Sequence, residues 1–247
     1  MNKIIQTDKK LASSKETSGV SQLFSDVSFK YDLMNDLMSL GLHRIWKKKF
    51  VSMIGDLDSK ILDMASGTGD IVIYLNNKAS KFGYSPEIFA CDFNDKMLSI
   101  AKDRIFDFNM SNVNFSLEDA HKISFKDDFF DYYLVSFGIR NFANVELALK
   151  ESLRVLKTTG QFLCLEFFKF DNKYFQNFYQ FYLFFILPKI GKIVSKKEYA
   201  YQYLSETIDN FYSKEDFRNM LYDVGFDDVG YIDLFPGIVT IFYGYKS

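Results

Sequence analysis

The chain has 247 residues, of which 48% are hydrophobic and 25% are charged, an ordinary composition for a globular protein with one core. Its formal net charge of −2 excludes a global attraction to nucleic acid, so we expect no nucleic-acid partner. The two histidines and two cysteines are far apart in the sequence, and both cysteines lie inside apolar runs. We therefore expect reduced core cysteines and no metal.

The first 20 residues lack the apolar core of a signal peptide and predict a short disordered lead. One domain is then expected over residues 21–247, opening with helices at 21–40 and 44–54. The nearest candidate for a membrane span, residues 178–188, is shorter than the ~20 apolar residues that cross a bilayer. These features predict a cytoplasmic protein.

Strand and helix patterns alternate through the middle of the chain. Short β-rich runs cover residues 61–64, 87–93, 113–119, 131–137 and 160–168, and the first three begin at 26-residue intervals. The gaps carry helical patterns at 70–78, 94–108 and 145–157, with Asn94 as an N-cap. This alternation predicts an α/β fold with a parallel sheet covered on both faces.

The last third of the chain adds further elements to the same domain. Helical patterns at 172–186 and 199–210 predict a helical insertion at about 170–210, and another helix follows at 213–223. Two closing strands, at 227–234 and 237–246, have a short connection that predicts an antiparallel hairpin at the sheet edge.

The loop after the first strand crowds small residues into the sequence LDMASGTGD. Ligands of open α/β sheets bind beyond the carboxyl ends of the strands. A dinucleotide fingerprint would need a third glycine where Val72 stands, and the flanking Asp63 and Asp70 would face phosphate oxygens. A cationic ligand without phosphate fits better, and S-adenosylmethionine is such a ligand. Asp63 attracts its positive end, while Gly67, Thr68 and Gly69 offer close backbone approach and a hydroxyl.

Two more carboxylates follow the next strands. Asp92 ends the second strand, where it can accept both ribose hydroxyls, and Asp119 follows the third, where it can accept the adenine amino group. Each aspartate alone also suits an N-cap or a solvated turn, and NAD would use Asp92 as well. A dehydrogenase is disfavoured because the one Tyr-x-x-x-Lys match, Tyr74 to Lys78, lies on the helix just after the loop. The pattern therefore favours methyl transfer.

Longer blocks at 24–47, 136–142, 187–195, 201–208 and 237–246 accompany these motifs. With them, the chain resembles the ubiquinone/menaquinone biosynthesis C-methyltransferase family (UbiE/MenG type) over residues 20–247. The resemblance implies a class I S-adenosylmethionine-dependent methyltransferase fold, Rossmann-like, with a seven-stranded, mostly parallel sheet. It implies methylation of a ring carbon of a polyprenylated hydroquinone, either a demethylmenaquinol or a 2-polyprenyl-6-methoxy-1,4-benzoquinol. The cofactor contacts that it implies are Thr68, Asp92, Asp119, Ala120 and Ser136.

Methylation of a ring carbon needs a deprotonated phenol, whose pKa near ~10 calls for a proton acceptor and a nearby positive charge. Arg140 can stabilise the phenolate but cannot act as a base. The candidate acceptors are Asp119 through water, Asp32 and His43, with Tyr31 orienting one of them. Helix capping is the competing interpretation for Tyr31 and Asp32, and core packing for His43. We interpret His121 as a surface residue.

A polyprenyl acceptor lives in a bilayer, so we expect contact with the inner face of the membrane or with a quinone-biosynthesis assembly. Residues 178–188 are aromatic and flanked by lysines, which suits an interfacial helix or a prenyl channel. A core helix or a homodimer contact are the alternatives. A C-methyltransferase of another small molecule and a non-catalytic quinone-binding or assembly protein on the same fold also remain as functions.

Overall fold

The computed structural model describes residues 41–108, 110–168 and 206–247, together with Asp36, Ser39, Phe181 and Tyr203. The expected lead at 1–20 lies outside the described residues, as do Tyr31 and Asp32. All but a few residues of the helix expected at 21–40 and of the insertion expected at about 170–210 lie outside them too.

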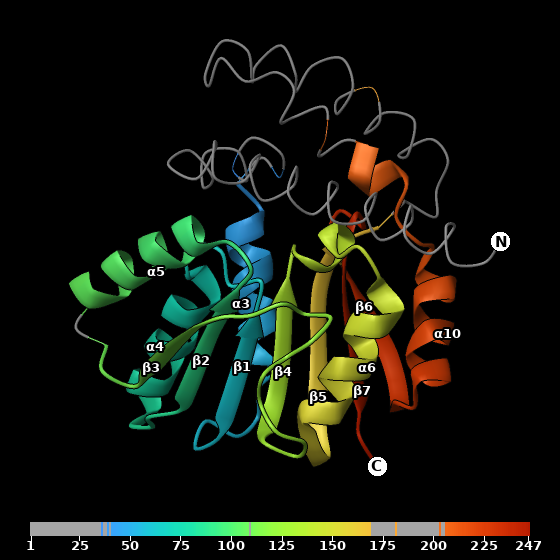
Figure 1. Ribbon diagram of the computed structural model, residues 1–247. Helices are drawn as coiled ribbons and strands as arrows, with labels where there is room; N and C mark the ends of the chain where they lie inside the picture. The colour runs from blue at the N-terminus through green and yellow to red at the C-terminus, as the bar shows by residue number, and fades with distance from the viewer. Residues whose placement is uncertain are drawn as a thin grey trace, which may run out of the picture.

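One seven-stranded sheet organises the described chain, in the order β3-β2-β1-β4-β5-β7-β6 (Figure 1). Its strands are β1 (Lys60–Met64), β2 (Glu87–Asp92), β3 (Val113–Leu117), β4 (Phe130–Ser136), β5 (Leu156–Phe167), β6 (Asp227–Leu234) and β7 (Val239–Tyr245). The first five are parallel, and β7 enters antiparallel between β5 and the edge strand β6. The predicted fold and its antiparallel hairpin are confirmed.

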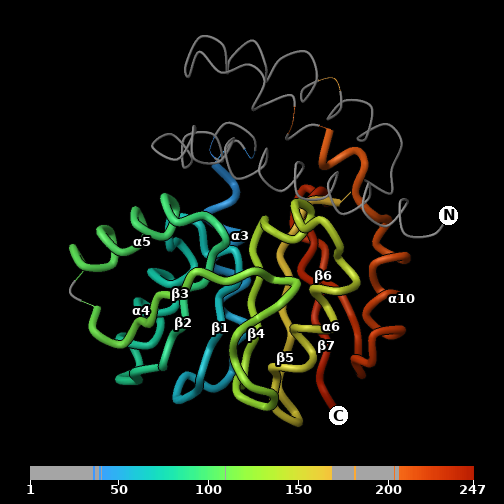
Figure 2. The backbone as a smooth tube through the Cα atoms, in the orientation of Figure 1, coloured from blue at the N-terminus to red at the C-terminus, as the bar shows by residue number. Residues whose placement is uncertain are grey.

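The helices join successive strands and cover the sheet. They are α3 (His43–Ser52), α4 (Asp70–Phe82), α5 (Asp95–Asp107), the short 3-10 helix η2 (Ile139–Asn141), α6 (Val145–Val155) and α10 (Lys214–Val224). The tube in Figure 2 shows the chain passing from β1 through α4 to β2 and through α5 to β3. The predicted N-cap is confirmed, because the Asn94 side chain accepts from the N–H groups of Lys96 and Met97.

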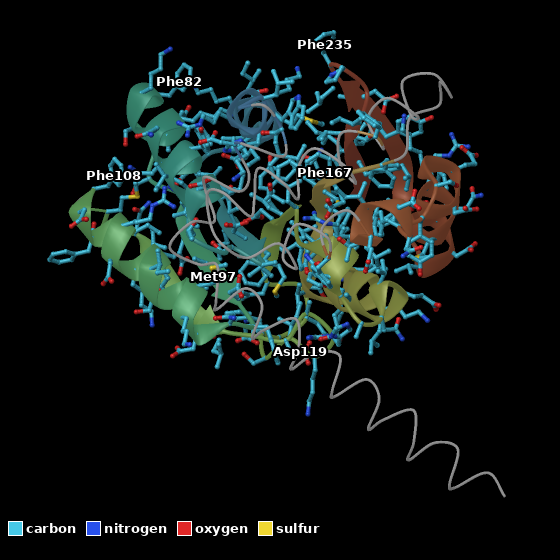
Figure 3. The ribbon with its side chains drawn as sticks, turned by 90° about the horizontal axis from the view of Figure 1, so that it is seen from above. Phe82, Met97, Phe108, Asp119, Phe167 and Phe235 are labelled. Carbon is cyan, nitrogen blue, oxygen red and sulfur yellow. The ribbon has the colours of Figure 1, made fainter. Side chains whose placement is uncertain are left out.

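Alternating strand residues divide the core into two layers. Ile61 and Leu134 pack on one face with α3, α4 and α5, whereas Leu62 and Val135 pack on the other with α6 and α10. Seen from above, α3 and α6 lie on opposite sides of the sheet (Figure 3). Cys91 and Cys164 are buried free thiols of this core, as predicted.

One boundary differs from the sequence prediction. The pattern predicts a helix through Lys157 and a strand from residue 160, whereas α6 ends at Val155 and β5 begins at Leu156. The register is irregular here, since Phe130 pairs with Leu156 but Tyr132 pairs with Gln161. The C-terminal Lys246 exchanges backbone hydrogen bonds with Thr159 and Gly160, which keeps this irregular stretch in the sheet. A local sequence pattern cannot predict a contact between residues so far apart in the chain.

Two features bear on ligands and membranes. Among the described residues, no cluster of three metal-ligating side chains is present. No helix in the described part of the chain combines the length and apolar character that crossing a bilayer requires.

Candidate active site

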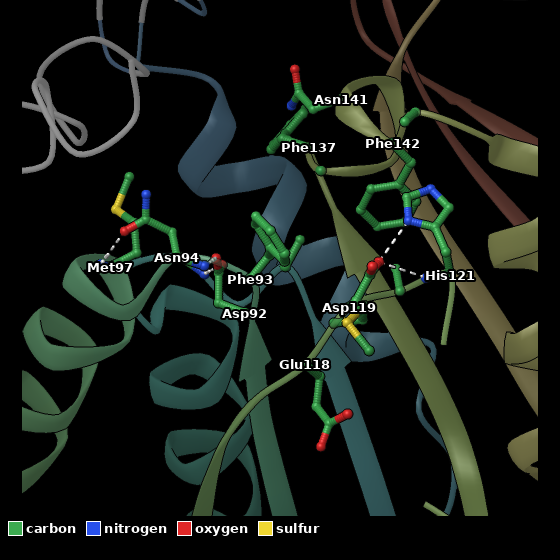
Figure 4. Close-up of a pocket in the computed structure, with 16 residues that line it drawn as sticks. Asp92, Phe93, Asn94, Met97, Glu118, Asp119, His121, Phe137, Asn141 and Phe142 are labelled. Atoms are coloured by element: carbon green, nitrogen blue, oxygen red, sulfur yellow. Dashed lines mark hydrogen bonds and ion pairs between the residues drawn. The ribbon is translucent and has the colours of Figure 1, made fainter. Parts of the chain in front are cut away.

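A pocket opens at the carboxyl edge of the sheet, beside the switch point between β1 and β4 (Figure 4). One side is formed by the loop after β1 and by the β2–α5 turn, and the other by the turn after β3 and the η2 loop. The lining residues are Met64, Ala65, Gly67, Asp92, Phe93, Asn94, Met97, Glu118, Asp119, Ala120, His121, Phe137, Gly138, Asn141, Phe142 and Ala143.

The small residues after β1 allow the backbone to turn sharply towards α4. Gly67 and Gly69 have φ angles of 57° and 83°, in the left-handed region that favours glycine. A Cβ at Gly69 would lie 3.1 Å from Ile105 Cδ1 and 3.2 Å from Ala101 Cβ on α5. The Ser66 N–H donates to the Cys91 carbonyl and ties the loop to the end of β2. Close packing of this loop therefore needs glycine.

Asp70, at the start of α4, is held by two cations. Its Oδ2 accepts from Lys47 Nζ at 2.7 Å and its Oδ1 accepts from Arg104 Nη2 at 2.9 Å. Burial opposes its ionisation, but Lys47 and then Arg104 lower the pKa of Asp70 below its usual value. Arg104 also donates to the Thr68 carbonyl at 2.7 Å. Asp70 thus anchors the loop to α3 and α5.

Asp63 is buried beneath the same loop, with 1% of its surface exposed. Its Oδ2 accepts from Ser66 Oγ at 2.7 Å, whereas its Oδ1 has no hydrogen-bond partner among the described residues. Burial raises the pKa of Asp63 to about 7, the charge of Asp92 adds to this, and the Ser66 hydrogen bond opposes it. Asp63 is not part of the pocket lining.

Asp92 presents a carboxylate to the pocket from the end of β2. Its Oδ2 accepts from the Gly67 N–H and its Oδ1 from the Asn94 N–H, both at 2.8 Å. Burial raises the pKa of Asp92, while these backbone donors favour its charged form. A third backbone hydrogen bond, from Phe93, also favours the charged form, and the carboxylate keeps acceptor capacity for at least one ligand hydroxyl in the pocket.

Asp119 and His121 lie on the opposite side of the pocket from Asp92 (Figure 4). Asp119 Oδ1 accepts from the His121 N–H at 2.9 Å and lies 2.6 Å from His121 Nδ1. His121 Nε2 accepts from the Asn144 N–H at 3.1 Å. The interpretation of His121 as a surface residue is wrong, because the ring lines the pocket and only 18% of the side chain is exposed. The sequence signal that could have indicated this role is the position of the histidine, two residues after Asp119.

Apolar lining residues were also missed by the sequence reasoning. Phe93 follows Asp92 directly and is 49% exposed in the open pocket. Met97 and Phe142 line the pocket too, and Figure 4 shows Phe93 between the two acidic sides. A flat heterocycle would cover these surfaces, because aromatic and thioether groups pack well against such rings.

The remaining predicted cofactor residues divide into two groups. Gly67 and Ala120 line the pocket, whereas Thr68, Gly69 and Ser136 do not. Thr68 is 4% exposed, and its described contact is the carbonyl bond to Arg104. Ser136 Oγ is buried with no hydrogen-bond partner among the described residues. These three residues support the loops behind the wall of the pocket.

Arg140, on η2, lines a second cavity that shares Phe142 and Ala143 with the first. Its Nη1 donates to the Phe137 carbonyl at 2.9 Å and to Glu166 at 2.5 Å. The two charged side chains are 2% and 0% exposed, so the ion pair is buried. Its Nε has no partner among the described residues. Arg140 therefore retains one buried donor.

His43 lies apart from the pocket lining, on α3. Burial, and then the charge of Lys47, lowers its pKa to about 4, so the ring is neutral at physiological pH. Its Nδ1 lies 2.9 Å from Ser39 Oγ. Of the two interpretations of His43, this geometry favours the packed core histidine.

The charge of the pocket decides which ligands it suits. Asp92, Glu118 and Asp119 line it, and none of the described lining residues is lysine or arginine. Such a wall disfavours phosphate groups and suits a cationic ligand that carries a sugar and a base. The sheet order, the glycine loop and the acidic residues at successive strand ends define a class I methyltransferase.

The chain belongs to the ubiE/COQ5 methyltransferase family, which it matches over residues 10–246. The curated ubiquinone/menaquinone biosynthesis C-methyltransferase UbiE of Rickettsia akari (strain Hartford) is 46% identical over 247 residues, covering 100% of each chain. The UbiE of Rickettsia africae (strain ESF-5) is 47% identical over 240 residues, 97% of each. A SAM-dependent methyltransferase structure from Aquifex aeolicus has a TM-score of 0.58 at 18% identity, covering 81% of this chain and 89% of that one. The family resemblance is thereby confirmed.

Proposed function

We propose that this protein transfers the methyl group of S-adenosylmethionine to a ring carbon of a polyprenylated hydroquinone in quinone biosynthesis. The observation that carries the proposal is the acidic pocket at the switch point of the sheet, with Asp92 braced by the Gly67 N–H. Membership of the ubiE/COQ5 family supports the acceptor class, because its curated relatives are named for ubiquinone and menaquinone biosynthesis.

The cofactor is proposed to lie across the pocket from Asp92 to Asp119. Asp92 accepts the two ribose hydroxyls, and the apolar surfaces of Phe93 and Met97 pack on the adenine. Asp119 accepts from the adenine amino group. The buried carboxyl group of Asp63 supplies attraction for the ammonium and sulfonium groups once it is ionised.

The acceptor is proposed to enter through the second cavity. Arg140 lines that cavity beside the cofactor pocket, and its Nε is a donor without a described partner. Asn141 lines the cofactor pocket, and its Oδ1 accepts from the Tyr203 hydroxyl at 3.1 Å, so its NH₂ group is left to donate. Both groups favour a developing phenolate oxygen, and the sulfonium needs no activation beyond an in-line approach. Asp32, which lies outside the described residues, remains the proposed proton acceptor, because the adenine amino group takes Asp119.

A labelling experiment tests the reaction. The purified chain is incubated with trideuteriomethyl-labelled S-adenosylmethionine and either a demethylmenaquinol or a 2-polyprenyl-6-methoxy-1,4-benzoquinol, and the product is analysed by fragmentation mass spectrometry. We expect the label on a ring carbon of at least one quinol. Label on oxygen, or turnover only with other small molecules, contradicts the acceptor assignment. Cofactor binding without turnover on any acceptor favours the binding or assembly protein.

The location of the reaction is part of the same proposal. A polyprenyl tail has to be presented by the inner face of a membrane or by a quinone-biosynthesis assembly, and a homodimer contact is the alternative role for residues 178–188. Residues 178–188 lie outside the described residues apart from Phe181, which is 54% exposed. Sedimentation with vesicles containing a polyprenyl quinol, compared with vesicles lacking it, tests the membrane contact.

A further inference from the structure

His121 joins two sides of the site that the sequence leaves unconnected. It follows Asp119 in the turn after β3, and its ring reaches Asn144, the N-cap residue of α6. Phe142 packs against the ring with the centroids 6.0 Å apart and the planes at 67°. The ring therefore has a fixed position between two loops, and no step of the proposed reaction uses it.

The hydrogen bond to Asn144 determines where the ring proton lies. A backbone N–H can only donate, so Nε2 has to accept from Asn144. In the neutral ring the proton then lies on Nδ1, which donates to Asp119 Oδ1 at 2.6 Å.

The two donors of His121 restrict Asp119 to one orientation. Oδ1 accepts from both the backbone N–H and Nδ1 of His121. No residue in the described part of the chain donates to Oδ2, and Asp119 lines the pocket. Oδ2 is therefore the oxygen that remains to receive a ligand.

We infer that His121 is a positioning residue that sets the nucleobase specificity of the site by holding Asp119 Oδ2 ready for the amino group of adenine. The inference rests on the proposed function, in which Asp119 faces the base. Hypoxanthine carries an oxygen where adenine carries the amino group, and this oxygen repels a fixed carboxylate. A carboxylate released from His121 can instead turn to the neighbouring N1–H of hypoxanthine. Loss of the His121 contact therefore weakens discrimination between the two bases.

Calorimetric binding of S-adenosylhomocysteine and S-inosylhomocysteine to the full chain tests this inference. The native protein is expected to prefer the adenine ligand by about tenfold or more, as for a charge-assisted hydrogen bond. His121→Asn places an amide N–H near the position of Nδ1 and should keep the ratio of the two Kd values within about twofold. His121→Gln places an oxygen near the position of Nε2, keeps the Asn144 bond, and should lower the ratio at least about threefold. Lys122→Gln is the matched control, since that side chain is exposed and should leave the ratio unchanged.

The possible outcomes separate the inference from the proposed function. Failure of the native protein to bind S-adenosylhomocysteine refutes both, whereas a native ratio retained by Asp119→Asn removes Asp119 from the base site. If Asp119→Asn abolishes the preference for the adenine ligand but His121→Gln keeps the native preference, only the inference about His121 is overturned. In the Asp119→Asn background, His121→Gln should change the ratio no further, because His121 acts through Asp119.

A spectroscopic measurement tests the ring proton directly. Long-range ¹H–¹⁵N spectra of the histidine-labelled protein contain two rings, and His121→Asn assigns one of them. We expect the His121 ring in the Nδ1–H form. A predominant Nε2–H form would overturn the proposed hydrogen bond to Asp119.

Discussion

Replacing Asp63 by Asn should remove a large pH dependence of stability. The carboxyl group is buried with a pKa of about 7, against a usual 3.8. Between these values the folded state holds the proton and the unfolded state has released it, so the free energy of unfolding falls as pH rises. The slope approaches about 1.4 kcal/mol per pH unit, and the total loss across the interval is about 4 kcal/mol. The loss is complete once the pH has risen through about 7.

Urea denaturation of the native protein and the variant from pH 5 to 8.5 measures this effect. The stability of Asp63→Asn relative to the native protein should rise with pH up to about 7 and then level off. The new NH₂ group occupies the place of Oδ1, which has no described partner, and this adds a penalty of about 1–3 kcal/mol at every pH. The test is therefore the change of the stability difference with pH, and the constant part of that difference carries no information about the pKa of Asp63.

Asp58→Asn is the matched control, because Asp58 is exposed shortly before the same strand and should leave the two pH curves parallel. Parallel curves for Asp63→Asn as well would show that burial does not raise the pKa of Asp63, and the reasoning would be refuted. The same variant should bind S-adenosylmethionine more weakly above pH 7, since the negative charge is lost. An unchanged affinity there would contradict the proposed electrostatic role.

Three further changes test the loops around the pocket. Asp92→Asn should weaken S-adenosylmethionine binding by about 10- to 100-fold in calorimetry, because the variant loses a charged acceptor for the ribose and places an amide NH₂ against a backbone N–H. A variant with native affinity would show that Asp92 does not bind the cofactor. Lys47→Met should lower the free energy of unfolding by about 3 kcal/mol, because it breaks the buried ion pair with Asp70, and adding Asp70→Asn should restore part of the lost stability. Native stability of Lys47→Met would mean that Arg104 alone holds Asp70. Arg140→Lys should lower kcat far more than it changes cofactor affinity. A single ammonium can replace Nη1, which donates to Glu166 and the Phe137 carbonyl, but it supplies no counterpart of the Nε donor that is proposed to favour the phenolate. Full activity of the variant would argue against a fixed guanidinium.

The strands, the order of elements and the acidic side of the cofactor pocket were predictable from the sequence. Apolar runs at regular spacing reflect burial on both faces of a parallel sheet, which is a local property of each segment. Gly67 and Gly69 reflect backbone angles that other residues adopt at a cost, and Asp92 follows its strand directly. Such features depend on neighbours in the chain, so they leave a readable pattern.

The roles of individual side chains depended on residues far away in sequence. Asp70 is anchored by Lys47 and Arg104, 23 and 34 residues away, and Arg140 meets Glu166 across 26 residues. The strand boundary at Leu156 likewise depends on the C-terminal Lys246. No periodic pattern encodes such pairs, because each is created when the sheet brings separate loops to one edge.

His121 illustrates the difference most clearly. Its distance from Asp119 in the sequence, two residues, allows a local turn but does not show that the ring lines the pocket. Only the packing of the η2 loop beside the turn after β3 brings Asn144 to Nε2 and fixes the ring proton on the side of Asp119. The sequence by itself determined the fold class and the acidic strand ends, because burial and backbone geometry act locally. The tertiary structure decided which atoms of those residues face the pocket, because hydrogen-bond direction depends on partners that only folding brings together.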